Sequence, residues 1–445
     1  MDRRFARRKQ EMLAECEVRP ELWGDLRRRL NAFLNPFAVC LRAEAQRAHA
    51  VEFCQGLLSK VERKNVESIA YQHDQDRRNL QHFIGTAQWD HGPLLDELNR
   101  QVGRELGEPD GVLVIDPSAF PKQGKKSVGV ARQWCGRLGK VDNCQLGVYL
   151  AYVSRQEYAL CDFRLYLPEE WTRDRHRCRL AGVPKTVRHR TRHALALEMI
   201  SARRAVLPHA WIAADDEFGK VTHFRRDLHA MGERYLLAVP DNLTARILDS
   251  DELPRRGPGG PRARPFVRIG QVRDELPAAA WQRVDVRDGE KGPLVVKVAV
   301  VPHVQTKGGG RTKYAERLVL IRYEDAGGTY HQDAYFSNAA ADTPAAEYAR
   351  VAGAEHRVEE CLRRAKSEVG LADYEVQKWT GWHHHQTLSL IAAWFLVQET
   401  RRGKKIHARF DSPSTATNPR SIAAANMEPH ASPLDCQSRP APLAA

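Results

Sequence analysis

Apolar residues recur every three or four positions along the first hundred residues, which is the spacing of helices that bury one face. The segments 22–34 and 53–70 show this spacing most clearly. Pro36 and the His-Gly-Pro sequence at 91–93 interrupt it, as residues that end or bend helices do. The pattern predicts a helical N-terminal domain over residues 1–105.

From residue 111 the pattern changes to short apolar runs, which indicate buried strands. The runs at 111–116 and 211–219 each lead from apolar residues into acids. Between them, 145–153 and 158–167 are separated by the polar sequence Ser-Arg-Gln-Glu and predict a hairpin, and a helix is predicted over 193–207. Strands and helices in this order indicate an α/β fold.

The later part of the chain divides into a β-rich stretch, a helical stretch and a tail. Residues 235–342 contain β-branched runs between turns rich in glycine and proline, which is typical of strands. Helices are predicted over 343–371, with Thr343 as the N-cap, and over 387–403. Residues 409–445 are rich in alanine, serine and proline without periodicity, and are predicted to be disordered.

The overall composition is that of a folded, basic protein. The 445 residues include 69 Lys and Arg against 56 Asp and Glu, so the formal net charge is +13. No run of about 18 apolar residues predicts a membrane span, and the first residues lack the apolar segment of a secretory signal, so a cytosolic location is predicted. The basic excess makes a polyanion, most commonly nucleic acid, the first partner to consider.

The nine cysteines are spread over the whole chain and none forms a Cys-x-x-Cys pair. This spacing argues against a zinc ribbon or a redox motif, and for buried thiols in a reducing compartment. The arginines that crowd the helical N-terminal segment fit either a solvated bundle face or a domain that binds duplex DNA.

Two aspartates follow strongly apolar runs. Asp116 comes after Val-Leu-Val-Ile, and Asp215 comes after Trp-Ile-Ala-Ala. Aspartate is a poor strand residue and is costly to bury, so each position needs a reason. The simple reason is that the strand ends there and the side chain faces water or caps the next turn. The alternative is that both carboxylates take part in one site.

Helical geometry adds a third acid. At about 100° per residue, the helix predicted over 343–371 has one apolar stripe, and Glu359 and Lys366 lie about 20° apart at its shoulder. Glu355 is the rival near this stripe, since Glu360 and Glu368 point toward solvent. The geometry therefore selects Glu359 or Glu355.

Two aspartates and a glutamate suit a hard divalent cation, because Mg²⁺ prefers oxygen ligands and leaves positions for phosphate and water. Two such ions about 4 Å apart support phosphodiester cleavage. The sequence around the acids favours a phosphate substrate, since the residues between Asp116 and Asp142 include no acid but six bases. These bases are Lys122, Lys125, Lys126, Arg132, Arg137 and Lys140. They would supply affinity for a phosphate backbone rather than sequence reading.

With these features the chain resembles the DDE transposases of bacterial insertion sequences, in the cut-and-paste branch with a β-rich insertion. The resemblance covers about residues 20–410. Its most specific stretch, VLVIDPSAFPKQGKKSVGVARQWCGRLGKVDNCQLGVYLAYV, places the family's first catalytic aspartate at Asp116. The family's Asp-x-x-Tyr-Gly motif is matched by Asp-Asp-Glu-Phe-Gly, with Phe218 for tyrosine, and selects Asp215 as the second.

The family's third signature is Tyr-x2-Arg-x3-Glu-x6-Lys. Glu359 and Lys366 match its glutamate and lysine, whereas its tyrosine and arginine positions hold Ala352 and Glu355. Arg357 is the candidate for the role of the arginine.

The resemblance implies a ribonuclease H-like core, in which a mixed sheet with flanking helices is interrupted by the β-rich insertion and preceded by the helical domain. It further implies that Asp116, Asp215 and Glu359 are catalytic and hold two Mg²⁺ ions, with Mn²⁺ as a substitute. The reaction would be hydrolysis at the element ends and transfer of the freed 3′-hydroxyl into target DNA. The side chains expected to contact DNA are Lys122, Lys125, Lys126, Arg132, Arg137, Arg357 and Lys366.

The implied partners are double-stranded DNA, both at the terminal inverted repeats and at the target, and a second copy of the chain in a synaptic complex in the bacterial cytosol. No membrane partner is expected. The predicted domains are a helical DNA-binding domain (1–105), the first part of the core (106–234), the β-rich insertion (235–342), the second part of the core with the glutamate helix (343–408) and the tail (409–445).

Two other functions fit the same sequence. The altered positions Ala352 and Glu355 are compatible with a decayed or domesticated DNA-binding protein that carries out no chemistry. A nuclease of the same fold that cuts DNA without joining it is the other alternative. Trp379 and Trp382 are interpreted as core anchors rather than base-stacking residues, and the three histidines that follow as a polar helix entry.

Overall fold

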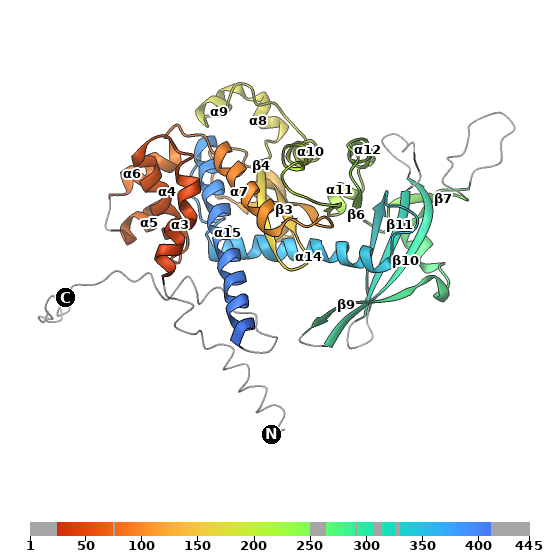
Figure 1. The fold of residues 1–445 in the computed structure, drawn as a ribbon. Helices are drawn as coiled ribbons and strands as arrows, with labels where there is room; N and C mark the ends of the chain where they lie inside the picture. Colours follow the sequence, from red (N-terminus) through yellow and green to blue (C-terminus); the bar gives the residue numbers. More distant parts are fainter. Residues whose placement is uncertain are drawn as a thin grey trace, which may run out of the picture.

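The computed structural model of the chain describes residues 25–73, 76–249, 264–289, 292–306, 314, 316–324 and 330–410. One large mixed sheet forms its centre, with helices packed along it (Figure 1). The tail predicted to be disordered lies outside the described residues, apart from residues 409–410, which belong to the last helix.

Five helices make up the described chain between residues 25 and 106, where no strand is found. They are α3 (Leu26–Ala38), α4 (Glu44–Leu57), α5 (Val66–Gln72), α6 (Arg77–Gly85) and α7 (Gly92–Leu106). Their buried residues recur at helical spacing, for example Leu26, Leu30 and Leu34 on α3. The described part of the N-terminal segment is therefore helical, as the apolar spacing predicts.

The helical spacing seen over 53–70 runs across a break, because the chain leaves the helix between α4 and α5. The Lys64 ammonium group donates to the backbone oxygen of Leu57 at 2.7 Å, which satisfies a carbonyl at the end of α4. Asn65 then caps α5, since its side-chain oxygen accepts from the backbone N–H of Ser68 at 2.8 Å. These two polar contacts stabilise a break that the apolar spacing alone does not reveal.

Twelve strands form one mixed sheet in the described chain. Their order is β2-β3-β1-β5-β6-β12-β11-β10-β7-β8, with β4 beside β3 and β9 beside β10. They are β1 (Val112–Pro121), β2 (Ala131–Cys135), β3 (Lys140–Val153), β4 (Tyr158–Leu165), β5 (Trp211–Ala214), β6 (Tyr235–Val239), β7 (Thr244–Ile247), β8 (Val267–Arg268), β9 (Gln282–Gly289), β10 (Gly292–Thr306), β11 (Glu316–Glu324) and β12 (Tyr330–Ser337).

The middle of the sheet is parallel. Strand β5 pairs in parallel with β1 on one side and with β6 on the other, and all four of its residues are buried. Burial on both faces explains why these strands read as continuous apolar runs. The predicted hairpin is β3 and β4, which pair antiparallel beside β1. The mixed α/β fold expected from the sequence is therefore present.

The prediction that the first strand ends at Asp116 is wrong, because β1 continues to Pro121. Its pairing with β5 stops at Ile115, opposite Ala214, whereas its pairing with β3 runs on. Asp116 thus lies at the point where β1 loses one of its two neighbours. Pro117 follows directly, in the one-sided setting in which sheets tolerate proline.

The strands of the β-rich stretch extend this same sheet. Strand β6 is followed in space by β12, β11 and β10, each paired antiparallel with the next. In Figure 1 they form the teal end of the molecule, opposite the orange and red N-terminal helices.

The remaining helices flank the sheet or connect its strands. They are α8 (Glu169–Arg173), α9 (Arg175–Leu180), α10 (Arg192–Arg203), α11 (Asp216–Gly219), α12 (Thr222–Ala230), α13 (Ile269–Asp274), α14 (Ala345–Glu368) and α15 (Trp379–Phe410), with short 3-10 turns at Gly136–Leu138 and Ala278–Ala280. Helix α14 packs across β1, β5 and β6 and reaches β9 and β10 (Figure 1). It is capped at Pro344, one residue after the predicted Thr343.

Helix α15 begins eight residues before the predicted 387, at Trp379. Trp382 is completely buried, as predicted for a core anchor. The polar helix entry predicted for the three histidines after it is wrong, because all three are buried. His384 stacks on Trp89 with 3.5 Å between ring centroids, and burial lowers its pKa to about 4, so it is neutral.

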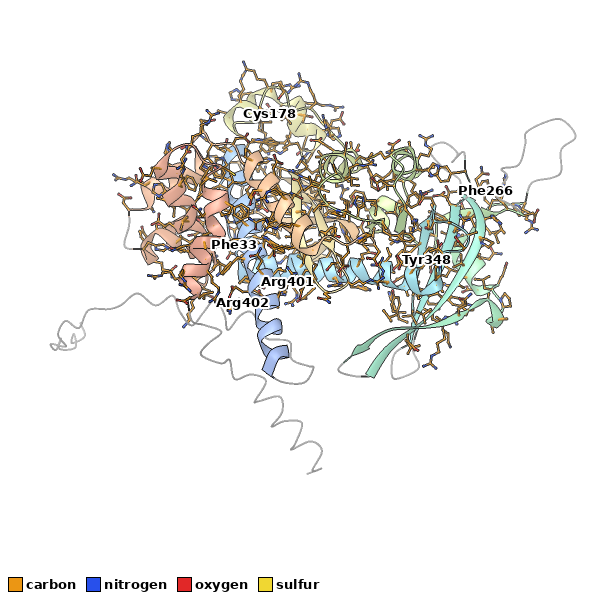
Figure 2. The ribbon with its side chains drawn as sticks, in the orientation of Figure 1. Phe33, Cys178, Phe266, Tyr348, Arg401 and Arg402 are labelled. Atoms are coloured by element: carbon orange, nitrogen blue, oxygen red, sulfur yellow. The ribbon has the colours of Figure 1, made fainter. Side chains whose placement is uncertain are left out.

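The N-terminal helices are fastened to α15. The Phe33 ring on α3 lies 5.1 Å from that of Phe395, and Arg29 pairs with Glu399 at 2.8 Å. Figure 2 shows Phe33 near Arg401 and Arg402, where the two helices meet. None of the helices within the described ranges is long and apolar enough to cross a membrane. The seven cysteines of those ranges are free thiols, and six of them are buried.

Candidate active site

A cavity of about 900 Å³ opens beside the parallel middle of the sheet. Its wall includes all three of the acids selected from the sequence, Asp116, Asp215 and Glu359. They come from β1, from the residue that follows β5, and from α14. The fold thus brings three acids that are far apart in the chain to one cavity.

The two aspartates are neighbours because their strands are. The last parallel pair joins Ile115 to Ala214, so Asp116 and Asp215 are the next residue on each strand. Side chains that follow adjacent parallel strands meet at one edge of the sheet, which is where open α/β sheets place their sites.

Asp215 also begins a short helical turn, α11. Its backbone oxygen accepts from the N–H groups of Phe218 and Gly219, at 3.1 and 3.0 Å. Gly219 fits closely against β6, since a Cβ atom there would lie 1.8 Å from the backbone oxygen of Ala238. The glycine of the Asp-x-x-Phe-Gly motif is therefore a packing requirement that fixes the turn carrying Asp215.

Glu359 projects from α14 as the helical geometry predicts. The apolar stripe of this helix is buried against the sheet, with Val358 and Leu362 at 1% and 3% exposure. Glu359 is exposed at the cavity, and Lys366 lines the same wall. Glu355, the rival glutamate one turn earlier, is largely buried beside the aspartates and is not part of the cavity wall.

The acids act on one another electrostatically. Burial, followed by the charges of Asp215 and Glu359, raises the pKa of Asp116 to about 8, and Lys366 opposes this shift. Burial and the neighbouring Glu217 raise the pKa of Asp215 to about 7. Burial, followed by the two aspartates, raises the pKa of Glu355 to about 8. The site has more negative charge than its protein surroundings neutralise.

The cavity wall also includes cationic side chains, beside further acidic, polar and apolar residues. Of the residues predicted to contact DNA, Arg137 and Lys366 are here. Burial lowers the pKa of Lys366, and the charge of Asp116 opposes that shift.

Among the wall residues that escaped the sequence analysis are Arg192 and Glu217. They form a two-pronged ion pair, with Nε–Oε1 and Nη1–Oε2 both at 2.6 Å. A signal was present, because Glu217 is inside the Asp-Asp-Glu-Phe-Gly motif and Arg192 lies in a strongly basic segment.

Three of the predicted DNA contacts lie in a second, smaller cavity. Lys122, Lys125 and Lys126 line a space of about 440 Å³ next to Tyr374. The Lys122 ammonium group lies 3.6 Å from the centre of the Tyr374 ring and donates to that residue's backbone oxygen at 3.0 Å. Burial lowers the pKa of Lys122 to about 8. Lys122 is thus held within the fold, while Lys125 and Lys126 are exposed beside it.

The last two predicted contacts lie outside both cavities. Arg132 is exposed on β2. Arg357 donates from Nη1 to the backbone oxygen of Ser154 at 2.6 Å and lies over the Tyr158 ring, away from the cavity wall that holds the acids. Arg357 therefore binds the β3–β4 turn in this structure.

The acidic residues at the site carry carboxylate oxygens, which are the type of ligand that a hard divalent cation prefers. Asp215 Oδ1 is buried without a hydrogen-bond partner. An added cation would favour the charged forms of Asp116, Asp215 and Glu355, whose pKa values are raised by burial and then by neighbouring acids. In the positions described, no three His, Cys, Asp or Glu side chains stand close enough to share one ion.

Comparisons with known proteins identify the family of the chain. A sequence model described as "DDE superfamily endonuclease" matches residues 36–293, which include both aspartates and end before Glu359. The probable transposase for insertion sequence element IS701 of Microchaete diplosiphon is 29% identical over 201 residues, covering 43% of this chain and 49% of that protein. The match thus spans about half the length of that relative.

Among solved structures, the piggyBac transposase in a synaptic complex with hairpin DNA aligns with 86% of this chain and 70% of its own, at 10% identity and a TM-score of 0.40. The family match covers more than half of the chain. The chain belongs to the DDE superfamily of endonucleases.

Proposed function

We propose that the chain is the transposase of an insertion sequence, which hydrolyses a phosphodiester bond at the ends of its element and joins the freed 3′-hydroxyl to target DNA. The observation that carries the proposal is the meeting of Asp116, Asp215 and Glu359 around one cavity, whose wall also includes cationic side chains such as Arg137 and Lys366. The transposase related to one half of the chain supports it.

In this proposal Asp116, Asp215 and Glu359 hold two Mg²⁺ ions, for which Mn²⁺ can substitute. When bound, the ions supply the Lewis acidity that activates the attacking oxygen and stabilises the leaving one. Lys366 and Arg137 bind phosphate groups on either side of the scissile bond. Arg192, held at the wall by Glu217, adds positive charge without approaching the aspartates.

The proposed core is ribonuclease H-like. It is supported by the parallel pairing of β1 with β5, by the antiparallel β3 and β4 beside them, and by α14 across the sheet. The strands beyond β6 then correspond to the insertion between the second aspartate and the glutamate. The N-terminal helices would bind the terminal inverted repeats, and a second copy of the chain would complete the synaptic complex.

The remaining basic residues would hold the DNA outside the cleavage site. Lys125, Lys126 and Arg132 are exposed on the side of the sheet that bears β2 and the loop before it. Lys122 and Arg357 would reach phosphate only by leaving their present partners.

The test is cleavage of duplex DNA that carries the element's own terminal repeats, by the purified chain with Mg²⁺. Glu359→Gln should lower the nicking rate at least about 100-fold, more than the loss of an outer partner of a metal ligand costs. The matched control is Glu360→Gln, one residue along the same helix, where the side chain pairs with Arg363 and is not itself part of the cavity wall. Equal rates for the two variants would refute the assignment of Glu359.

The same assay separates the alternative functions. Glu355 lies where the family signature has arginine, and its buried carboxyl beside the aspartates is the observation that favours a DNA-binding protein without chemistry. Binding to the repeats without any nicking, in Mg²⁺ or in Mn²⁺, would establish that alternative. Nicking without joining of pre-cleaved ends would instead establish a nuclease that does not transfer strands.

A further inference from the structure

The tip of the β2–β3 hairpin exposes apolar side chains beside the candidate active site. Trp134 and Val141 are cross-strand partners, and they are 58% and 51% exposed, while Leu138 in the turn is 43% exposed. We call these three residues the hairpin patch. More than half of the Trp134 side chain is thus uncovered by the described residues, and apolar side chains of this kind gathered at one place mark a binding surface.

The hairpin patch adjoins the acids. Trp134, Gly136 and Arg137 line the same cavity as Asp116 and Glu359. The charge of Arg137 also contributes to lowering the pKa of Lys366 on α14, after burial, which places the hairpin tip close to that helix. The Trp134 indole is therefore part of the wall that a molecule bound in the cavity faces.

The charges of the hairpin define the chemistry of that occupant. Arg132 lies two residues before Trp134 on the same face of β2, and its guanidinium reaches toward the backbone oxygen of Val141. Arg137 is exposed in the turn, whereas Lys140, at the start of β3, pairs with Asp142 at 3.2 Å. An aromatic face beside the cations Arg132 and Arg137 is suited to a nucleotide, in which a flat base is attached to an anionic phosphate.

We propose that Trp134 stacks on an unpaired base of the DNA strand held in the cavity, with Arg132 and Arg137 on the flanking phosphates. The base has to be unpaired and unstacked, because within a duplex the neighbouring base pairs cover both of its faces. The inference rests on the proposed function, since it takes the strand at the cavity to be DNA. It adds a base-holding residue to a site otherwise composed of charges.

The experiment compares two single strands with the same number of phosphates. One is an oligothymidylate of about 12 nucleotides, and the other is the same strand made of abasic sites; binding to the full-length chain is followed by fluorescence anisotropy without divalent metal. The wild-type chain should bind the thymidylate about tenfold more tightly, because stacking of one base is worth about 1–3 kcal/mol. Trp134→Ala should lose that preference and keep its affinity for the abasic strand, and Trp134→Phe should retain part of it.

Tyr71→Ala is the matched control, because Tyr71 on α5 is also 58% exposed and does not line the cavity. It should leave the preference unchanged. The proposal is overturned if Trp134→Ala weakens the binding of both strands equally, or if it changes the binding of neither strand. It is also overturned if Trp134→Ala turns a dimer into a monomer by light scattering, because the hairpin patch would then be an interface between copies. This binding measurement omits metal, so a negative result here can be distinguished from the absence of cleavage in the test of the proposed function.

Discussion

At the scale of single residues, the site is a set of carboxyl groups that repel one another. The fold places Asp116, Asp215 and Glu355 in partly buried positions where their charges add. Such an arrangement destabilises the protein unless a cation joins it, and active sites commonly carry this kind of strain.

This repulsion makes the stability of the metal-free protein depend on pH. A carboxyl has a pKa of about 4 when unfolded, whereas that of Asp116 is about 8 in the fold. Between these values the folded chain keeps a proton that the unfolded chain releases, so stability falls as the pH rises from about 4 to about 8. Asp116→Asn should therefore raise the melting temperature in EDTA at pH 8 and have little effect near pH 4.

The control for this measurement is Glu360→Gln, which replaces an exposed carboxylate and should change stability by less than about 1 kcal/mol at either pH. Mg²⁺ should raise the melting temperature of the wild type and have much less effect on Asp116→Asn. A wild type that is most stable at pH 8 without metal would contradict the account of the site.

At this scale the sequence singled out three acids that line the cavity, because each has a local signal. Asp116 and Asp215 follow apolar runs, and Glu359 lies at the edge of a helical stripe. Trp134 had no such signal, since the exposure of an indole depends on which strand ends up at the edge of the sheet.

At the scale of secondary structure elements, the site depends on short connections that fit closely. Helix α11 is only four residues long, yet it sets the direction of Asp215 after β5. Its last residue touches the backbone of β6.

Gly219→Ala should therefore change the position of Asp215, although Gly219 itself does not line the cavity. The added methyl group would overlap the backbone oxygen of Ala238, so α11 has to move, and we expect a loss of about 1–3 kcal/mol in the free energy of unfolding together with weaker Mg²⁺ binding. Gly353→Ala on α14 is the control, because a Cβ atom there meets nothing within 4 Å and alanine favours a helix by about 0.5–1 kcal/mol. Denaturant unfolding measures both; equal effects would contradict the role given to Gly219.

The existence of most elements was predictable from the sequence, whereas their ends were not. The apolar period identified the helix that became α14 to within a few residues, and the hairpin β3–β4. The break between α4 and α5 depends on Lys64 reaching back to the carbonyl of Leu57, which is a tertiary contact that no period encodes. The three histidines of α15 were misread because their burial is imposed by Trp89 and the N-terminal helices.

At the scale of the whole molecule, the sheet connects the acids to the β-rich stretch. A completely buried ion pair lies at this junction, where Arg225 of α12 donates to Glu316 of β11 at 2.6 Å. Arg225 also donates to Thr306 of β10 and to the backbone oxygen of Gly219, beside the turn of Asp215. One guanidinium thus joins the site to the far strands.

Breaking this pair from one side should be costly. Arg225→Met leaves the Glu316 carboxylate buried and unpaired, and the expected loss is about 3–5 kcal/mol of unfolding free energy. Arg225→Met with Glu316→Leu should recover much of it, because no buried charge remains. Arg363→Met, which breaks an exposed pair with Glu360, should cost less than about 1 kcal/mol. If denaturation gives the same loss for both single variants, Arg225 is not the connection described.

The sequence indicated a β-rich stretch between the second aspartate and the glutamate, but not that its strands would continue the central sheet. That outcome depends on β6 pairing with β5 on one side and β12 on the other, which is a long-range match of two apolar strands. Neither partner is identifiable from its own composition.

The central claim is that segments far apart in the chain form one site for divalent cations. Its most direct test replaces Mg²⁺ with Fe²⁺ in the full-length chain and adds ascorbate and peroxide, so that the backbone is cut wherever the iron is bound; mass spectrometry locates the cuts. We expect cuts near Asp116, near Asp215 and near Glu359, all suppressed together by excess Mg²⁺ and by Asp116→Asn. Cuts at one of the three places alone, or a pattern that Asp116→Asn leaves unchanged, would contradict the account.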